Sequence, residues 1–286
     1  MTRPGRSIVF VNGAWMASES WSDFRKPFEA TGYLIHTMEW PFLDAPPDEL
    51  LRNPPKSVGA LSTTSIIAYY ANFIKDLPEP PLIIGHSFGG LFIQMLLDQG
   101  LGWAGMAIDS APIGGIIPGP TTFMAALPVI MRLGGWRHPY TLTKQGFCST
   151  CANIASGSVQ DEAYERFIVS TSGLIFYQNA RWIDTFIRLT WRTQTILITA
   201  AEKDRTISPD VAKVAHRKQK HSRVKTGFLS FQGISHFLIA EPGREKVATS
   251  ALEWAEQVAN LQSEDCQSGQ ALDIPYQVAS ERRQAR

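Results

Sequence analysis

The sequence predicts an α/β fold with a mostly parallel central sheet and helices on both of its faces. Short apolar runs rich in β-branched residues, such as 8–11 and 195–199, alternate with longer amphipathic stretches such as 63–76. This alternation is typical of parallel strands joined by crossover helices. The length of 286 residues suits one large domain, or a core domain with an inserted subdomain.

The expected strands are short, mainly apolar runs, and the run at 81–84 is typical of a strand buried on both faces. The strands are expected at 8–11, 34–38, 81–84, 105–108, 195–199 and 227–231. The expected helices lie between them, at 21–30, 63–76, 88–99, 209–219 and 245–260. Pro27 is expected to kink or shorten the first helix. The proline-rich stretch 41–55 is expected to be a loop, because proline joins neither a ladder nor a helix interior.

The alternation of strands and helices breaks after residue 110 and resumes near residue 193. The intervening stretch, 111–192, is first rich in Gly and Pro and then helical, with large apolar side chains throughout. We expect it to form an inserted, mainly helical cap on a core made of residues 1–110 and 193–261. Residues 262–286 are polar and are expected to form a C-terminal tail.

Charge and cysteine content argue against several classes of function. The net charge is only +1, and the Lys/Arg-rich stretch 213–225 has no interleaved aromatic residues, so no nucleic-acid partner is expected. The three cysteines are too few for a disulfide framework, and the single C-x-x-C at 148–151 lacks the second pair that a zinc site needs. With no apolar segment long enough to span a bilayer, we expect a soluble cytoplasmic protein.

The residues that follow the strand at 81–84 carry the main functional signal. Gly85-His86-Ser87-Phe88-Gly89 fits the pattern G-x-S-x-G and lies between a strand and a helix. A nucleophilic serine at such a sharp, strained turn needs small residues two positions away on either side. The following helix points its N-terminus at the serine, where backbone N–H groups favour negative charge. Ser87 is therefore the predicted nucleophile.

With this motif in this context, the sequence resembles the α/β-hydrolase superfamily of serine esterases, lipases and thioesterases, over most of residues 8–258. The resemblance implies the α/β-hydrolase fold, a catalytic triad in the chain order serine, acid, histidine, and no metal or organic cofactor. A serine at the turn between strand and helix argues against the chemistry of those relatives that use an aspartate as the nucleophile.

The triad acid is expected after a late strand. Asp204 lies after the strand at 195–199, in a segment that resembles the family's strand–loop region, and is the preferred candidate. Glu202 is an alternative because it is nearer to the end of that strand. Asp109 is a second alternative, because some relatives carry the acid after the earlier strand. Asp109 could instead have a purely structural role, in which its carboxylate accepts hydrogen bonds from backbone N–H groups.

The triad histidine is expected on the loop after the last strand. His236 lies in Gly233-Ile234-Ser235-His236, which resembles the family's G-x-S-H segment. The oxyanion hole is expected to use the backbone N–H of Phe88 and that of Ala14, with Trp15 as the alternative to Ala14. The family commonly has His-Gly before this donor, whereas this chain has Asn-Gly.

The resemblance implies a serine hydrolase that acts on a carboxylic ester, lactone or thioester. The many apolar residues of the cap favour a small, lipophilic substrate, unless most of them form the core of the cap itself. Two other interpretations remain open, because a fold does not fix a reaction. One is a non-hydrolytic enzyme, such as an acyltransferase, lyase or cyclase acting on a polyketide or other natural product. The other is a ligand receptor.

Overall fold

The computed structural model describes residues 6–220 and 222–268. Within these residues, six strands form one sheet in the order β2-β1-β3-β4-β7-β8, and every neighbouring pair is parallel. The strands are β1 (Ser7–Val11), β2 (Leu34–Thr37), β3 (Leu82–His86), β4 (Ala104–Ile108), β7 (Thr195–Ala201) and β8 (Thr226–Phe231). The predicted α/β fold with a parallel central sheet is therefore confirmed.

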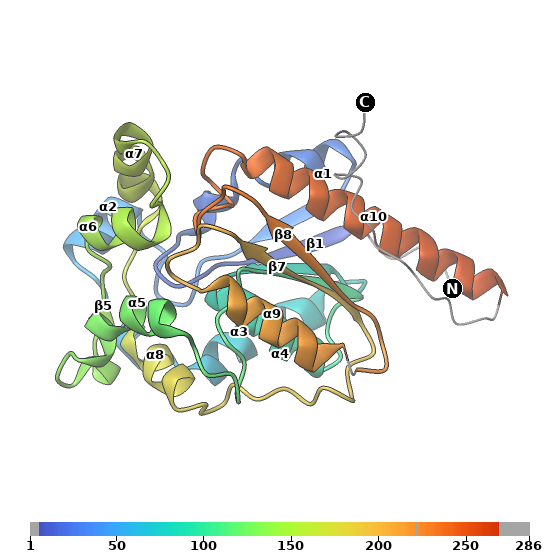
Figure 1. Ribbon diagram of the computed structural model, residues 1–286, viewed down its shortest axis with the longest axis horizontal. Helices are drawn as coiled ribbons and strands as arrows, with labels where there is room; N and C mark the ends of the chain where they lie inside the picture. The colour runs from blue at the N-terminus through green and yellow to red at the C-terminus, as the bar shows by residue number, and fades with distance from the viewer. Residues whose placement is uncertain (1–5, 221, 269–286) are drawn as a thin grey trace.

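Helices pack on both faces of this sheet (Figure 1). One face is covered by α3 (Thr63–Asp76), α4 (Phe88–Asp98) and α9 (Pro209–Gln219). The other face is covered by α1 (Lys26–Ala30) and α10 (Arg244–Ser268). No helix among the described residues is long and apolar enough to cross a membrane.

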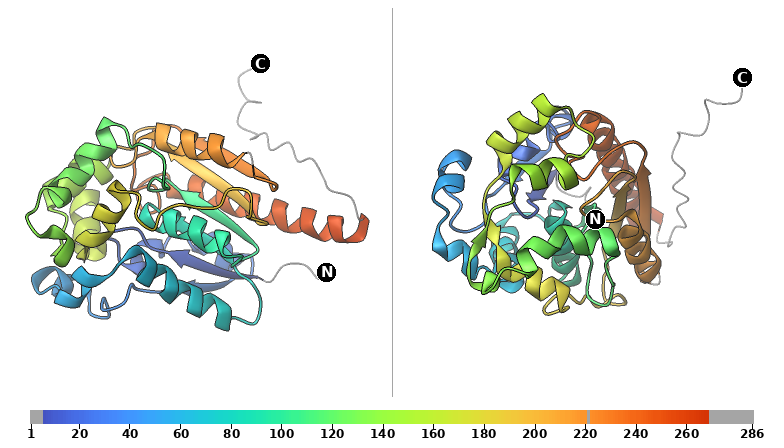
Figure 2. Two further views of the ribbon diagram at one scale, coloured as in Figure 1. Left: turned by 90° about the horizontal axis from the view of Figure 1, so that it is seen from below. Right: turned by 60° about the vertical axis from the view of Figure 1, so that its left-hand side comes forward.

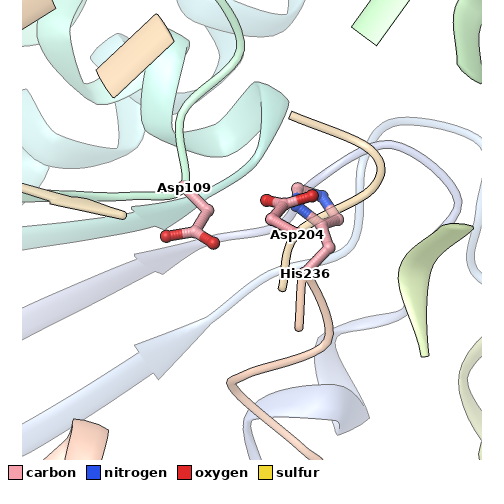
Figure 3. A group of neighbouring side chains, drawn as sticks. All are labelled: Asp109, Asp204 and His236. Atoms are coloured by element: carbon pink, nitrogen blue, oxygen red, sulfur yellow. The ribbon is translucent and has the colours of Figure 1, made fainter. Parts of the chain in front are cut away.

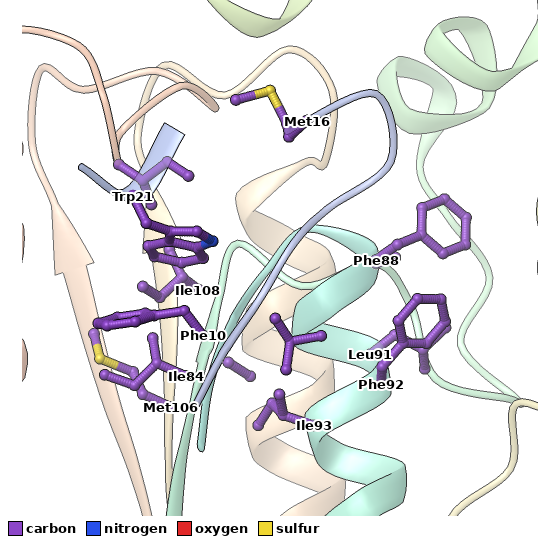
Figure 4. Packing of buried hydrophobic residues seen from close by; sticks show 14 of the residues in the cluster. Phe10, Met16, Trp21, Ile84, Phe88, Leu91, Phe92, Ile93, Met106 and Ile108 are labelled. Carbon is purple, nitrogen blue, oxygen red and sulfur yellow. The ribbon is translucent and has the colours of Figure 1, made fainter. Parts of the chain in front are cut away.

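The core lies on both sides of the central strands. The Phe10 and Trp21 rings pack against each other on one side, with centroids 4.8 Å apart, and Leu91 and Phe92 of α4 lie on the other side (Figure 4). All of these side chains are almost completely buried. Because β3 and α4 meet inside this packed region, the turn between them is held rigidly.

The strands β4 and β7 are neighbours in the sheet but far apart in sequence, and the stretch between them adds no strand to the main sheet. We call residues 111–192 of this stretch, the expected cap, the insertion. The helices and short strands of the insertion lie at one end of the molecule, away from the C-terminal half of α10, and the chain after the last of these helices runs back along the molecule to β7 (Figures 1 and 2). The insertion contains the short strands β5 (Pro139–Tyr140) and β6 (Thr171–Ser172), which pair antiparallel. Its helices are α5 (Pro120–Ile130), η3 (Gly135–Arg137), α6 (Lys144–Gly146), η4 (Phe147–Cys151), α7 (Gly157–Phe167) and α8 (Gly173–Ala180).

Three expected elements differ in the structure. The helix expected at 21–30 is a 3₁₀ turn, η1 (Ser18–Trp21), followed by the short α1, because Pro27 fits only the first turn of a helix. The expected loop 41–55 contains α2 (Pro47–Arg52), where Pro47 likewise occupies the first turn; η2 (Lys56–Ala60) follows it.

The last helix extends beyond the expected end at residue 260, to Ser268. The first part of the expected tail, 262–268, is therefore helical. The remainder, 269–286, lies outside the described residues.

Candidate active site

Ser87 lies in a sharp turn between β3 and α4. Its backbone angles, φ 56° and ψ −119°, are strained for a residue that carries a side chain. The turn depends on the two flanking glycines. A Cβ on Gly85 would collide with the carbonyl of Gly89, and a Cβ on Gly89 would collide with the carbonyl of Val11. The strand–turn–helix geometry expected for a nucleophile elbow is therefore present at this serine.

The backbone of Ser87 is anchored on both sides. Its N–H donates to the carbonyl of Ile108 at 2.9 Å, and its carbonyl accepts from the N–H of Ala111 at 2.9 Å. Phe88 begins α4, so its N–H has no acceptor within the helix. This N–H is therefore available to an anion beside the serine.

His236 and Asp204 come from the loops after β8 and β7, and they are in direct contact. The Nδ1–H of His236 donates to Oδ2 of Asp204 at 2.6 Å, and both side chains are buried (Figure 3). The other oxygen, Oδ1 of Asp204, accepts from the N–H groups of Thr206 and Ile207 at 2.6 and 2.7 Å. These bonds fix the carboxylate so that it orients the imidazole.

Ser87 and His236 line one small cavity together with Ala14 and Trp15. The structure thus brings the predicted serine, histidine and oxyanion loop to the same place. The Asp204–His236 hydrogen bond leaves Nε2 as the ring nitrogen able to accept a proton. This is the nitrogen that a general base in such a triad uses.

The loop that carries His236 is held by two residues, Glu241 and His86, for which the sequence predicted no such contact. The buried carboxylate of Glu241 accepts from the N–H of Ser235 at 2.7 Å and from its hydroxyl at 2.6 Å. Nε2 of His86 donates to the carbonyl of His236 at 2.8 Å. A glutamate at the start of the last helical region carries no sequence signal for this role, because the contact depends on how the chain turns after residue 235.

The alternative acid Glu202 does not contact the histidine. Its side chain is exposed, accepts from the N–H of Gly233 at 2.9 Å and forms an ion pair with Lys203 at 3.1 Å. Although it is closer to β7 in sequence, Glu202 lies on the outside of the turn. The geometry therefore favours Asp204.

Asp109, the other alternative, is buried next to Asp204 and His236 (Figure 3). Its carboxyl accepts from the N–H of Ala201 at 3.1 Å and from the hydroxyl of Thr199 at 3.2 Å. The bond from the Ala201 N–H is of the kind expected if Asp109 has a structural role. Asp109 thus contributes to the surroundings of the Asp204–His236 pair, while the hydrogen bond to the imidazole comes from Asp204.

Asp109, Asp204 and His236 each offer one polar atom within 4.8 Å of the others, a spacing that a metal ion could also use. Burial raises the pKa of both carboxyl groups. The neighbouring Asp204 raises the pKa of Asp109 further, whereas the side-chain hydrogen bond with Asp109 lowers the pKa of Asp204. The amides of Thr206 and Ile207 favour ionised Asp204. Asp109 has a single amide donor, so the negative charge is more favourable on Asp204. The hydrogen bonds that already engage these atoms favour an acid–histidine pair over a metal site.

The expected oxyanion loop follows β1 and is held by Asn12. The Nδ2 of Asn12 donates to the carbonyl of Met38 at 3.0 Å, and its Oδ1 accepts from the indole of Trp21 at 2.9 Å. A Cβ on Gly13 would lie 2.9 Å from the Cβ of Ser87, so the loop passes directly over the serine. The asparagine that replaces the family's histidine thus fixes this loop.

A second, larger cavity extends from Ser87 into the insertion. With its open mouth it encloses about 680 Å³, and it is lined mainly by apolar and small residues. Its walls include Trp15 and Phe88, which both pack against Phe176 with ring centroids 4.8 Å apart in each case. Its polar lining groups are hydroxyls and one amide, and no charged side chain is among them. The cavity therefore favours an uncharged, apolar ligand.

The pH dependence of any reaction that uses His236 as a base follows from its burial. Burial lowers the pKa of His236 from 6.5 to about 4, although Asp109 and Glu241 oppose this shift. A base with a lowered pKa stays neutral at lower pH, so kcat/KM for an uncharged substrate should fall only as the pH drops below 6.5 toward 4. A pH–rate profile measures this, and an acid limb centred above 6.5 would contradict it.

The chain matches the model of the alpha/beta hydrolase family over residues 8–248. Because this match covers most of the sequence, the protein belongs to that family. The resemblance inferred from the elbow motif is confirmed. No curated protein sequence matches the chain significantly.

Three solved structures illustrate the similarity of fold. Polyneuridine aldehyde esterase is 13% identical over 88% of this chain and 99% of its own, with a TM-score of 0.64. The Paleococcus ferrophilus monoacylglycerol lipase is 18% identical over 89% and 95%, with a TM-score of 0.63. A pyrethroid hydrolase from Sphingobium faniae JZ-2 is 15% identical over 87% and 97%, with a TM-score of 0.58. At these identities the likeness concerns the fold alone.

Proposed function

We propose that this protein is a serine hydrolase that cleaves a carboxylic ester, lactone or thioester of an apolar small molecule. Ser87 is the nucleophile, His236 the general base and Asp204 the orienting acid. The observation that carries the proposal is the 2.6 Å hydrogen bond between His236 and Asp204, at a cavity that the strained Ser87 also lines. Membership of the alpha/beta hydrolase family supports it.

In the first half of the reaction, the Ser87 hydroxyl attacks the carbonyl carbon of the substrate while Nε2 of His236 takes its proton. Asp204 stabilises the resulting imidazolium, which then protonates the leaving alcohol or thiol. In the second half, His236 activates a water molecule that attacks the acyl-enzyme. The acid product leaves and the serine regains its proton.

The negative charge that forms on the carbonyl oxygen is stabilised by backbone N–H groups. The N–H of Phe88 lies at the start of α4, and the N–H of Ala14 comes from the loop over Ser87. Each such donor typically contributes about 3 kcal/mol to the transition state. Because both donors belong to the backbone of anchored segments, they need no reorganisation during the reaction.

The insertion (residues 111–192) acts in this proposal as a cap that supplies the substrate pocket. The uncharged lining of the larger cavity supports a lipophilic acyl or alcohol group as the part that binds there. The direct test is turnover of p-nitrophenyl acetate and p-nitrophenyl octanoate by the purified protein. We expect hydrolysis of both, with a higher kcat/KM for the octanoate. Failure of the folded protein to hydrolyse either ester would contradict the proposal.

Filling the cavity should reduce activity on the longer ester selectively. Ala126 of α5 lines the cavity, and an Ala126→Phe substitution would occupy space needed by an acyl chain. We expect kcat/KM for the octanoate to fall about tenfold or more, since steric fit of this kind is worth 1–3 kcal/mol, and the acetate to change little. Ala30→Phe, at an exposed position of α1, is the matched control. Equal losses on both esters would show that the cavity does not hold the acyl chain.

A further inference from the structure

The helix α5 is exposed on its outer side yet carries no charged residue. Met124 in the middle of the helix and Met131 at its C-cap are 61% and 73% exposed, and Leu133 just beyond it is 95% exposed. Seven positions separate the two methionines, so they lie on the same helical face. A surface helix of a globular protein normally has a charged or polar outer face. The apolar outer face of α5 therefore favours an apolar partner.

The stretch of sequence around α5 contains basic residues but no acidic ones. The sequence from 110 to 160 contains no aspartate or glutamate. Arg132 and Arg137, which follow α5, are both exposed. The structure thus combines large exposed apolar side chains with a basic border. This combination is complementary to a layer that is apolar inside and anionic at its surface.

We propose that α5 and the residues on either side of it, 117–137 in all, form a docking surface for an anionic lipid membrane. The methionines and Leu133 enter the boundary between headgroups and acyl chains, and the two arginines bind lipid phosphates. Figures 1 and 2 place this part of the insertion at the outer end of the molecule, where a flat surface can reach it. The protein attaches to one leaflet and does not cross it.

Docking in this orientation brings the lipid to the substrate cavity. Phe123 on α5 both lines that cavity and is 49% exposed, so the cavity wall is continuous with the apolar face. A lipophilic substrate can therefore pass from the membrane to Ser87 with little exposure to water. This last step rests on the proposed hydrolase function, whereas the docking itself does not.

The test is co-sedimentation of the intact protein with vesicles of phosphatidylcholine alone or mixed equally with phosphatidylglycerol. We expect binding to the mixed vesicles, weaker binding to phosphatidylcholine alone, and a decrease with added salt. Because burial of each methionine contributes to binding, Met124→Glu and Met131→Glu should each weaken it about tenfold. Arg132→Gln should weaken it about fivefold, as expected for one basic residue near an anionic surface.

Leu34→Glu is the matched control, because Leu34 is 62% exposed but lies on β2, outside the insertion. Its binding should equal that of the wild type, and melting temperatures should show that every variant is folded. The proposal is overturned if mixed vesicles do not bind the folded wild type, or if the Met124→Glu protein binds as well as the control. It is also overturned if light scattering shows a dimer that the methionine substitutions dissociate, since the face then joins two copies. Binding requires no turnover, so this result is independent of the ester assays.

Discussion

Replacement of Ser87 by alanine is expected to lower ester hydrolysis by a factor of about 10⁵, because it removes the atom that forms the acyl-enzyme. The residual rate would come from the oxyanion donors and from substrate binding, which the substitution leaves in place. The same change should abolish covalent labelling by a fluorophosphonate probe. Alanine is accommodated easily, since it keeps the Cβ and removes only the hydroxyl.

The matched control is Ser110→Ala, which removes another buried hydroxyl close to α4. That hydroxyl donates to the carbonyl of Ala111 and accepts from Gln94, so its loss should lower stability but leave labelling intact. If the wild type is folded and is not labelled, Ser87 is not an activated nucleophile. If the Ser87→Ala protein is still labelled at the wild-type rate, another residue is the nucleophile.

The elbow could be predicted from the sequence because its constraints are local. The glycine at 85 is required by a backbone contact within the turn itself. The glycine at 89 is required by the close approach of Val11 of β1, but it belongs to the same five-residue motif, and the flanking apolar strand and helix have clear periodicities. The parallel sheet was predictable for the same reason. Two of the three elements that differed, α1 and α2, are short segments in which proline lies at a helix start, where it does not break the helix.

Contacts between distant segments could not be read from the sequence. Glu202 and Asp204 are only two positions apart, and which of them reaches His236 depends on the direction of the turn after β7. The support of the histidine loop by Glu241 depends in the same way on the path of the chain after β8. The exposure of α5 is a further example, because an apolar sequence predicts burial unless the neighbouring elements are known.

The two buried aspartates should respond very differently to conversion into asparagine. Asp204→Asn replaces the hydrogen-bond acceptor of His236 by an amide, which can stabilise the wrong tautomer of the imidazole and carries no charge to stabilise the imidazolium. We expect kcat to fall by about 10⁴-fold at neutral pH. The substitution changes few contacts in size or shape, so the melting temperature and the affinity for a substrate analogue should change much less than kcat.

Asp109→Asn, in contrast, should change kcat/KM by less than about tenfold. In free energy, a factor of ten corresponds to a pKa shift of one unit. Two buried carboxyl groups this close to one another do not both ionise readily, and the donors around Asp204 make it the better site for the charge. A neutral amide at position 109 therefore resembles the protonated acid and can still accept from the N–H of Ala201. Kinetics of the two variants, measured in parallel across pH, separate the alternatives. If Asp109→Asn loses as much activity as Asp204→Asn, both carboxyl groups are needed; if only Asp109→Asn is inactive, the triad acid is Asp109.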